Sequence, residues 1–514
     1  MSTDTAHLRL ESSSSWLATL RDRLTPATRE VATNGRVYAL LAVLSLALGA
    51  LTLLYPSTPT YDPWAWILWG REIADLDLQT TGGPSWKPFP VIFTTVFSLF
   101  GEAAPDLWLV VARGGAVLAV LLAFRLAWRL TGGGGVAAAT AGVVGAVALI
   151  ISSQFVRTMA LGNSEGLMVA FTLWGVERHL DGRYRQAFVL AFLASLLRPE
   201  IWPFLGAYGL WLLLIDRRAL WLVVSGGLLT LALWFLPEYW GSGNFNRAAD
   251  RAQQPNPNSP AFAAHPFVEV IKDTWPLVIT PVKGAAAFAL ALAAVDWIRT
   301  RRQGAVLAVA FLGLSWIVLI GVMTEAGFSG NPRYIILGTS LLAVVGGVGF
   351  GRVVQFAGTA MRRVAGPSHP RVATAVGLVV FLALTLASVH WAKPRFDNFD
   401  ELDRALRYQA ELRYDLKDVL VKAGGADAFK ACGKATAGKF SVPLVAWYLE
   451  EHTLDVGLDP APEGVVVAAR TTNKPSLKPQ PEQPYPPGYE RVAMLRTTTL
   501  WSTCPAEAGA APRS

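Results

Sequence analysis

Charged residues are scarce in this sequence. Asp, Glu, Lys and Arg make up 16% of its 514 residues, whereas 53% of the residues are hydrophobic. A soluble domain usually carries about 25% charged residues, so this composition excludes an ordinary soluble protein. The apolar residues fall into runs of about 20, which is the length of helix that crosses a bilayer. The sequence therefore predicts an integral membrane protein with several spans.

Cysteine and histidine are also scarce, and common catalytic motifs are missing. The two cysteines, Cys432 and Cys504, lie near the C-terminus, and the six histidines are scattered along the chain. They form no metal-ligand spacing, so no cofactor is indicated, while a divalent metal is left open. The Gly132–Gly135 run lacks the preceding strand and the following lysine of a phosphate-binding loop, and we interpret it as a turn.

An apolar core is missing from the N-terminal segment as well. Residues 1–35 are polar and rich in Ser, Thr and Arg, which argues against a cleavable signal peptide. We expect this segment to be a disordered cytosolic tail with a short amphipathic helix around residues 16–24. The net charge of +8 does not indicate a nucleic-acid partner, because most arginines flank the apolar runs.

Eleven membrane spans are predicted from the apolar runs. With the N-terminus in the cytosol, the loops richest in arginine all lie inside, as the positive-inside tendency requires. The expected location is the plasma (inner) membrane, with the lipid bilayer as a partner. The predicted spans cover residues 37–55, 107–128, 136–154, 165–177, 187–199, 201–215, 219–236, 277–297, 305–323, 334–351 and 372–391.

Two outer segments interrupt the transmembrane domain, which is predicted to cover residues 36–391. The first is residues 56–106, and the second is residues 237–276. Within the first, residues 62–76 and 87–101 are too short to span the membrane. We interpret them as helices that lie in the outer interface.

The tail at residues 392–514 is predicted to form a small extracytoplasmic α/β domain. An amphipathic helix at residues 397–421 would precede strands at Val442–Tyr448 and Val465–Ala469. A Pro-rich loop of polyproline character would follow at residues 473–488. A disulfide between Cys432 and Cys504 would suit an oxidising compartment, although two unrelated reduced thiols are the alternative.

Asp62 and Lys87 stand out in the first outer segment. Asp62 precedes Pro63, which suits the start of a helix, but its carboxylate could also take a proton from an incoming hydroxyl group. Lys87 is the only lysine among the first 271 residues, and it lies between Trp86 and Pro88. It is either an interfacial cation beside a tryptophan or an ammonium that holds a lipid phosphate.

Further charged residues lie where predicted spans meet the outer face. Glu165 either supports the start of the fourth span or serves as a second carboxylate. Arg198 and Glu200 are either a self-contained ion pair or functional charges near membrane depth. Arg333 is either an interfacial anchor or a phosphate-binding cation. Four residues of the second outer segment could contact substrate, but their spacing does not differ from that of a solvated loop: Arg247, Asp250, Arg251 and His265.

The order of these motifs resembles that of the GT-C class glycosyltransferases, polytopic enzymes that use polyprenyl-phosphate sugars. Over roughly residues 37–340 the pattern is similar to lipid A aminoarabinose transferases and protein O-mannosyltransferases. That pattern has an acid after the first span, a Lys-Pro that opens a juxtamembrane helix ending in Phe-Gly, and an arginine opening the second span. It continues with an outer acid before the fourth span and an Arg-Tyr at a late span. The matching residues here are Asp62, Lys87-Pro88 with Phe100-Gly101, Arg113, Glu165 and Arg333-Tyr334.

The resemblance implies roles for these residues. Asp62 would be the general base, with inversion at the anomeric carbon, and Lys87 and Arg333 would hold the donor phosphate. From its place near membrane depth, Arg198 is a further candidate for binding the donor phosphate. The family often has paired acids where this sequence has Asp-Pro, so the partner acid would be Glu165 or Glu72. Further residues expected around the substrate cavity are Tyr61, Trp64, Trp86, Arg113, Glu200 and Tyr334.

The function expected from this resemblance is that of an inverting membrane glycosyltransferase. It would move a hexosyl or pentosyl group from a polyprenyl-phosphate donor to a hydroxyl group of a cell-envelope glycan, lipid or protein at the outer face. The alternatives are a transporter or flippase, a surface-polysaccharide polymerase or ligase, and a non-enzymatic assembly factor. A transporter favours symmetry between halves and charges deep within spans, whereas the charges here cluster at outer loop ends.

Overall fold

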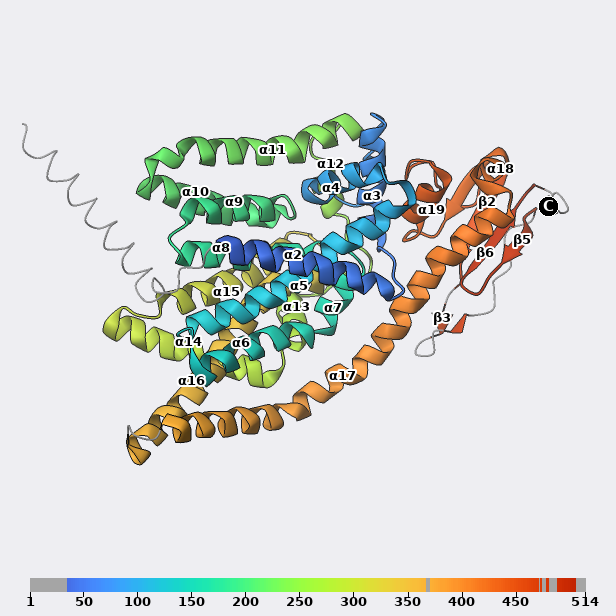
Figure 1. Cartoon of the computed structure of the whole chain (residues 1–514). Helices are drawn as coiled ribbons and strands as arrows, with labels where there is room; N and C mark the ends of the chain where they lie inside the picture. Colours follow the sequence, from blue (N-terminus) through green and yellow to red (C-terminus); the bar gives the residue numbers. More distant parts are fainter. Residues whose placement is uncertain (1–34, 367–369, 471, 474–477, 480–487, 505–514) are drawn as a thin grey trace, which may run out of the picture.

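The computed structural model describes residues 35–366, 370–470, 472–473, 478–479 and 488–504 (Figure 1). The predicted cytosolic tail and its amphipathic helix therefore lie outside the described residues, apart from Gly35. Most of the predicted Pro-rich loop lies outside them too. Of its described residues, Gly488 lies in a turn, and the others belong to the short strands β3 (Thr472–Asn473) and β4 (Lys478–Pro479), which pair antiparallel.

Each of the eleven predicted spans is a helix, and most of these helices run side by side in Figure 1. Together with the small C-terminal sheet, they make the chain an all-α polytopic membrane protein with an appended α/β unit. The helices are α2 (Gly35–Leu51), α5 (Ala104–Leu130), α6 (Gly135–Ile150), α8 (Glu165–Leu180), α9 (Tyr184–Ser195), α10 (Trp202–Ile215), α11 (Leu220–Ser242), α14 (Thr280–Thr300), α15 (Gly304–Glu325), α16 (Ile336–Ala365) and α17 (Pro370–Lys422).

The number of full-length spans among the described helices is lower than the predicted eleven. Seven are long and apolar enough to cross a membrane, or eight if α6 and α7 (Ser153–Ala160), which meet at 63°, form one bent span. Helices α8, α9 and α10 contain 16, 12 and 14 residues. Pro199 and Pro203 separate α9 from α10, because proline removes a backbone donor and clashes with the preceding turn. Short helices at membrane depth are tolerated where protein or a cavity surrounds them.

Helix α16 packs closely against α6 and α14 through glycines. A methyl group at Gly347 would lie 2.4 Å from the Ala141 carbonyl oxygen of α6, and one at Gly349 would lie 2.0 Å from that of Ala285 in α14. Neither distance leaves room for a side chain. Small residues allow this close approach of helices in membranes. This helix begins directly after the short helical turn Pro332–Ile335, which contains Arg333 and Tyr334.

Four short helices come from the two segments predicted to lie outside the membrane. The two predicted from the first outer segment are α3 (Tyr61–Ala74) and α4 (Pro88–Ser98), and each has a proline in its first turn, which suits a helix start. The second outer segment contains α12 (Arg247–Ala252) and α13 (Pro266–Thr274). In Figure 1, α3, α4 and α12 lie at the same end of the bundle as the C-terminal sheet.

The C-terminal unit has a four-stranded sheet in the order β1-β2-β6-β5. Strand β1 (Lys434–Ala437) is parallel to β2 (Gly464–Ala469), and β2 confirms the predicted strand. Strands β6 (Thr498–Ser502) and β5 (Glu490–Met494) complete the sheet in antiparallel pairing. Helix α18 (Gly425–Ala431) precedes β1, and a disulfide joins Cys432 to Cys504, the pair named from the sequence.

The strand predicted at Val442–Tyr448 is wrong, because this segment is helix α19 (Val442–Leu449). Pro443 occupies its first turn, and seven of its eight residues are buried. A short apolar run that is buried on all sides has no periodicity that separates helix from strand. The predicted helix at residues 397–421 is correct but is not separate, since it is the second half of α17. The predicted domain boundary at residues 391/392 therefore falls inside a continuous helix.

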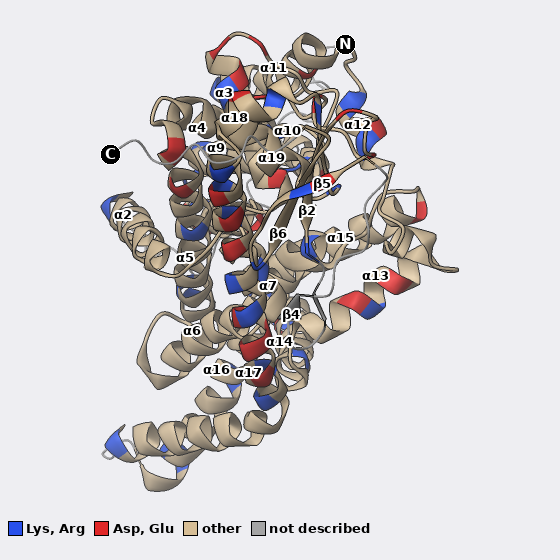
Figure 2. Ribbon diagram, turned by 90° about the vertical axis from the view of Figure 1, so that its right-hand side faces the viewer, with Lys and Arg blue, Asp and Glu red and all other residues tan. Residues whose placement is uncertain are grey.

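Polar contacts dock the C-terminal unit onto α3. The Arg71 guanidinium donates to the carbonyl oxygens of Trp447 and Glu451 at 3.0 and 3.1 Å. His452 Nδ1 lies 2.8 Å from Glu72 Oε1. Figure 2 looks onto this end of the molecule and shows acidic and basic residues grouped on α12, α13 and α17. The unit is thus fixed relative to the outer helices.

Candidate functional site

A cavity of about 630 Å³ lies at the end of the bundle where α3 and α12 are found. Its walls come from α3, the segment before α4, the α9–α10 connection, α11, α12, α15, the turn before α16 and the loop between β1 and α19. Eight of the predicted site residues line it: Tyr61, Asp62, Trp86, Lys87, Arg198, Glu200, Arg333 and Tyr334. Residues from four distant parts of the sequence therefore meet in one place.

Asp62 and Arg333 form an ion pair in this cavity. Asp62 Oδ2 lies 2.7 Å from Arg333 Nη2, and Arg333 Nη1 donates to Asn163 Oδ1 at 2.9 Å. The Asp62 side chain retains 13% of its exposure, so its carboxylate borders the cavity although it has a partner. The second Arg333 donor is anchored on Asn163, which orients the guanidinium toward both Asp62 and the cavity.

Lys87 is almost fully buried at the start of α4. Its Nζ donates to Ser164 Oγ at 3.3 Å and lies 4.9 Å from the ring centre of Trp66. Burial, followed by the positive charge of Arg198, lowers the pKa of Lys87 from its ordinary value to about 8. Among the described contacts no acid pairs directly with this ammonium. It is therefore a cation whose charge is available to a bound anion.

Arg198 is the third cation of the cluster. It binds Glu165 Oε1 at 2.5 Å and Glu200 Oε1 at 3.2 Å, and its guanidinium lies 4.0 Å from the ring centre of Tyr334. The self-contained Arg198–Glu200 pair considered from the sequence is therefore part of a larger buried network. A buried charge of this kind needs partners because its desolvation is costly.

Three predicted site residues do not line the cavity. Glu165 is fully buried behind Arg198. Trp64 donates to Thr58 Oγ1 and packs against Trp447 of the C-terminal unit. Arg113 donates to the carbonyl oxygens of Ala160 and Thr52, and so ties α5 to the ends of α7 and α2. Each has a structural partner that its sequence position did not reveal.

Glu72, the other candidate for a partner acid, also lies away from the cavity. It is buried, accepts a hydrogen bond from the Gln79 backbone N–H at 3.0 Å and contacts His452. Asp62 and Glu200 are the two carboxylate residues among those that line the cavity. The structure therefore places Asp62 at the site without an adjacent second acid from α3.

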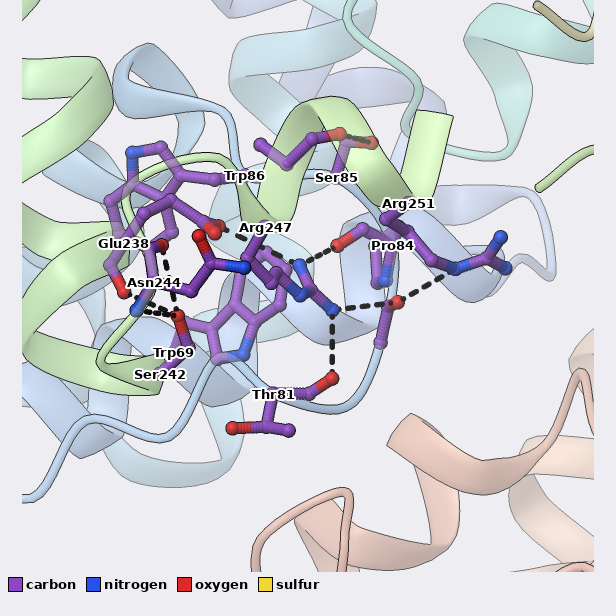
Figure 3. A network of polar contacts seen from close by, with 12 residues as sticks. Trp69, Thr81, Pro84, Ser85, Trp86, Glu238, Ser242, Asn244, Arg247 and Arg251 are labelled. Atoms are coloured by element: carbon purple, nitrogen blue, oxygen red, sulfur yellow. Dashed lines mark hydrogen bonds and ion pairs between the residues drawn. The ribbon is translucent and has the colours of Figure 1, made fainter. Parts of the chain in front are cut away.

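Arg247 holds the segment that leads to Lys87, a role that no sequence motif indicated. Its guanidinium donates to the carbonyl oxygens of Pro84, Gly82 and Gly83, the last two at 2.6 and 3.0 Å (Figure 3). Glu238, at the end of α11, is fully buried and lies 3.6 Å from Arg247. The residue expected in a solvated loop is thus buried and anchors a backbone segment.

Two further contacts secure this segment. Ser85 Oγ donates to the Ala248 carbonyl oxygen at 2.9 Å, and Trp86 Nε1 donates to that of Leu233 at 3.0 Å. The Trp86 ring also packs against Trp69 of α3 with centres 5.5 Å apart. Because Lys87 follows directly, α11 and α12 set where its ammonium lies.

We expect Arg247→Ala to lower the stability of the protein by about 3–5 kcal/mol, because it removes one partner of a buried ion pair. Most of that loss should come from the buried Glu238 carboxyl group and from the carbonyl oxygens of Gly82 and Gly83, which all lose this partner. The double variant Arg247→Ala with Glu238→Gln should therefore regain part of the stability. Thermal unfolding in detergent micelles measures both effects. An unchanged unfolding temperature for Arg247→Ala would contradict the anchoring role.

No cluster of three or more His, Cys, Asp or Glu side chains in the described ranges could hold a metal ion. The cavity instead presents cations. Lys87, Arg198, Arg251, Arg333 and Lys439 line it together with the carboxylates of Asp62 and Glu200, an excess of three positive charges. A cavity with this charge suits an anionic ligand such as a phosphate.

The chain shares its overall fold with solved ArnT structures, in agreement with the fold expected from the sequence motifs. The chain is similar to the crystal structure of ArnT from Cupriavidus metallidurans bound to undecaprenyl phosphate, with a TM-score of 0.53 and 13% identity, covering 93% of this chain and 100% of that one. The apo state of the same ArnT gives a TM-score of 0.51 at 13% identity, covering 92% and 99%. No protein-family model matches the sequence, and no curated protein matches it.

Proposed function

We propose that this protein transfers a sugar from a polyprenyl-phosphate donor to a hydroxyl group of a cell-envelope acceptor at the outer face of the plasma membrane. One observation carries the proposal. Asp62 and the cations Lys87, Arg198 and Arg333 line a single cavity that also has an apolar wall from membrane-spanning helices. The site thus combines a candidate base, a phosphate-binding group and a surface for a lipid.

The donor would bind with its phosphate at the cations and its chain along the apolar wall. That wall contains Trp234 and Phe235 of α11 and Leu319, Ile320 and Met323 of α15. Arginine suits phosphate because its planar donors can bind two oxygens at once, whereas lysine acts as a compact charge. The similarity to an ArnT structure that holds undecaprenyl phosphate supports this type of ligand.

The proposed reaction is a single displacement at the anomeric carbon. The acceptor oxygen forms the new bond while the bond from the anomeric carbon to the phosphate oxygen breaks, which inverts the configuration. The acceptor proton passes to Asp62 and then to water. The leaving phosphate gains negative charge, which Lys87, Arg198 and Arg333 stabilise. Groups that bind charge developing in the transition state lower the barrier directly.

Lipid extracts from cells that lack this protein test the proposal. We expect them to accumulate a polyprenyl-phosphate sugar, whose mass would identify the transferred group. The wild-type gene should remove the accumulated lipid, and a gene with Asp62→Asn should not. If extracts of the deletion and wild-type cells contained the same lipids, and the purified protein did not bind undecaprenyl phosphate, the proposed function would be wrong.

Binding of undecaprenyl phosphate should weaken above about pH 8. The pKa of Lys87 is lowered to about 8 by burial, so its ammonium is present below this pH and is lost above it. If the phosphate needs the charged form, the dissociation constant should approach a tenfold rise per pH unit beyond the pKa, about 1.4 kcal/mol per unit. Fluorescence of the cavity residues Trp86, Trp202 and Trp234 reports this binding.

The matched control is Lys87→Arg, because a guanidinium stays charged across this range. Its dissociation constant should vary little between about pH 7 and 9.5. A wild-type protein with the same flat profile would show that Lys87 does not titrate at the phosphate.

A further inference from the structure

We infer that the loop between β1 and α19 of the C-terminal unit forms an acceptor subsite that binds a sugar ring. This inference rests on the proposed function and names the class of acceptor for the same cavity. The loop contributes Lys439 and Phe440 to the cavity wall. These are the residues through which the C-terminal unit reaches the site.

Phe440 is unusually exposed for its type. It retains 65% of its surface, although most of the apolar segment that follows it is buried in α19. Its ring lies edge-on to that of Tyr61, with centres 6.1 Å apart and planes at 86°. Tyr61 directly precedes Asp62 on α3. The exposed aromatic surface therefore borders the candidate base.

Polar groups surround this aromatic pair. Lys439 Nζ donates to Asn256 Oδ1 at 3.2 Å, which bridges the C-terminal loop to the segment after α12. Arg251 also lines the cavity and donates to the Gly83 carbonyl oxygen at 3.3 Å. The rim thus presents an amide, two cations and an aromatic face within one wall of the cavity.

These residue types match a sugar ring. A pyranose has an apolar face of C–H groups, which packs against an aromatic ring, and a rim of hydroxyl groups, which binds amides and cations. Binding sites generally combine apolar and aromatic walls with a few placed polar groups in this way. A ring seated on Phe440 would direct a hydroxyl group along Tyr61 toward Asp62.

The subsite and the proposed donor groups come from different elements around the cavity. Lys87 and Arg198 lie where α4 and α10 begin, and the apolar wall for the lipid comes from α11 and α15. Phe440 instead belongs to a unit that Arg71 fixes on α3 through two hydrogen bonds. Acceptor and donor would therefore approach the Asp62 carboxylate from different walls.

Kinetics in reconstituted vesicles test the inference. The donor is the polyprenyl-phosphate sugar isolated from the deletion cells, and the acceptors are oligosaccharides released from their envelope or peptides that contain Ser and Thr. Phe440→Ala should raise the KM for the oligosaccharide about tenfold or more, since an aromatic contact of about 1.4 kcal/mol corresponds to that factor. Binding of undecaprenyl phosphate should not change, and Phe440→Trp should keep a low KM.

Tyr414→Ala is the matched control, because Tyr414 is an exposed aromatic residue of α17 that does not line the cavity. It should leave the KM unchanged. An unchanged oligosaccharide KM in Phe440→Ala would overturn the inference, and so would transfer to peptides alone. A wild-type protein that does not bind undecaprenyl phosphate would instead count against the proposed function.

Discussion

Asp62→Asn is expected to reduce sugar transfer by about 10²–10⁴-fold, the usual contribution of a positioned general base. The amide keeps the size of the side chain but cannot take the acceptor proton. Arg333 retains its hydrogen bond to Asn163, so its guanidinium should stay near the cavity. The measurement is the transfer rate in reconstituted vesicles, with undecaprenyl phosphate binding as a second readout that should persist.

Asp75→Asn provides the control for this result. It makes the same chemical change at the exposed C-terminal end of the same helix, α3, and Asp75 does not line the cavity. Its transfer rate should equal that of the wild type. If Asp62→Asn kept more than about half of the activity, the proton would have to go elsewhere, since a general base contributes far more than twofold.

Lys87→Ala is expected both to weaken binding of the polyprenyl-phosphate donor and to slow sugar transfer. Removing one hydrogen-bond donor that stabilises charge developing in the transition state costs about 10²–10³-fold in rate, or about 3–4 kcal/mol. The effect should be large because the ammonium is buried and has Ser164 as its direct hydrogen-bond partner. Measurements are the dissociation constant of undecaprenyl phosphate by tryptophan fluorescence and the transfer rate at saturating donor.

Lys272→Ala is the matched lysine control. Lys272 is exposed on α13 and pairs with Glu269, so its removal should change neither quantity. The two cavity variants should then differ in pattern: Lys87→Ala loses donor binding and transfer, whereas Asp62→Asn loses transfer alone. If Lys87→Ala bound undecaprenyl phosphate as tightly as the wild type, Arg198 and Arg333 alone would bind the phosphate. Lys87 would then have only a structural role.

Much of the fold followed from the sequence because apolar length and arginine position are local properties. The eleven segments proved helical, and so did the two outer helices that carry Asp62 and Lys87. The span count was less certain, because α8, α9 and α10 lie below the length that crosses a bilayer. Their lengths depend on neighbours that local hydropathy does not describe.

The site was predicted less completely because long-range contacts decide it. Glu165 was expected at the cavity from its position beside a span, yet Arg198 from another helix pair holds it in the interior. Arg247 was expected in water, yet its partners are backbone carbonyl oxygens more than 160 residues earlier. Backbone acceptors carry no residue identity, so no motif could have indicated this contact. The contact of Phe440 with Tyr61 likewise depends on how the C-terminal unit packs onto α3, which the sequence does not indicate.

Helix α17 connects the helical bundle to the C-terminal unit. Its 53 residues, which include Pro394, follow a bent path from the bundle to the sheet, with a contour length of about 80 Å at 1.5 Å per residue (Figure 1). Inserting one amino acid midway along it would turn everything beyond by about 100°. Such a rotation would oppose the hydrogen bonds that hold the C-terminal unit on α3, so either those bonds would break and the β1–α19 loop would leave the cavity, or α17 would have to distort. The length and the helical register of α17 must therefore match the position at which the C-terminal unit packs on α3.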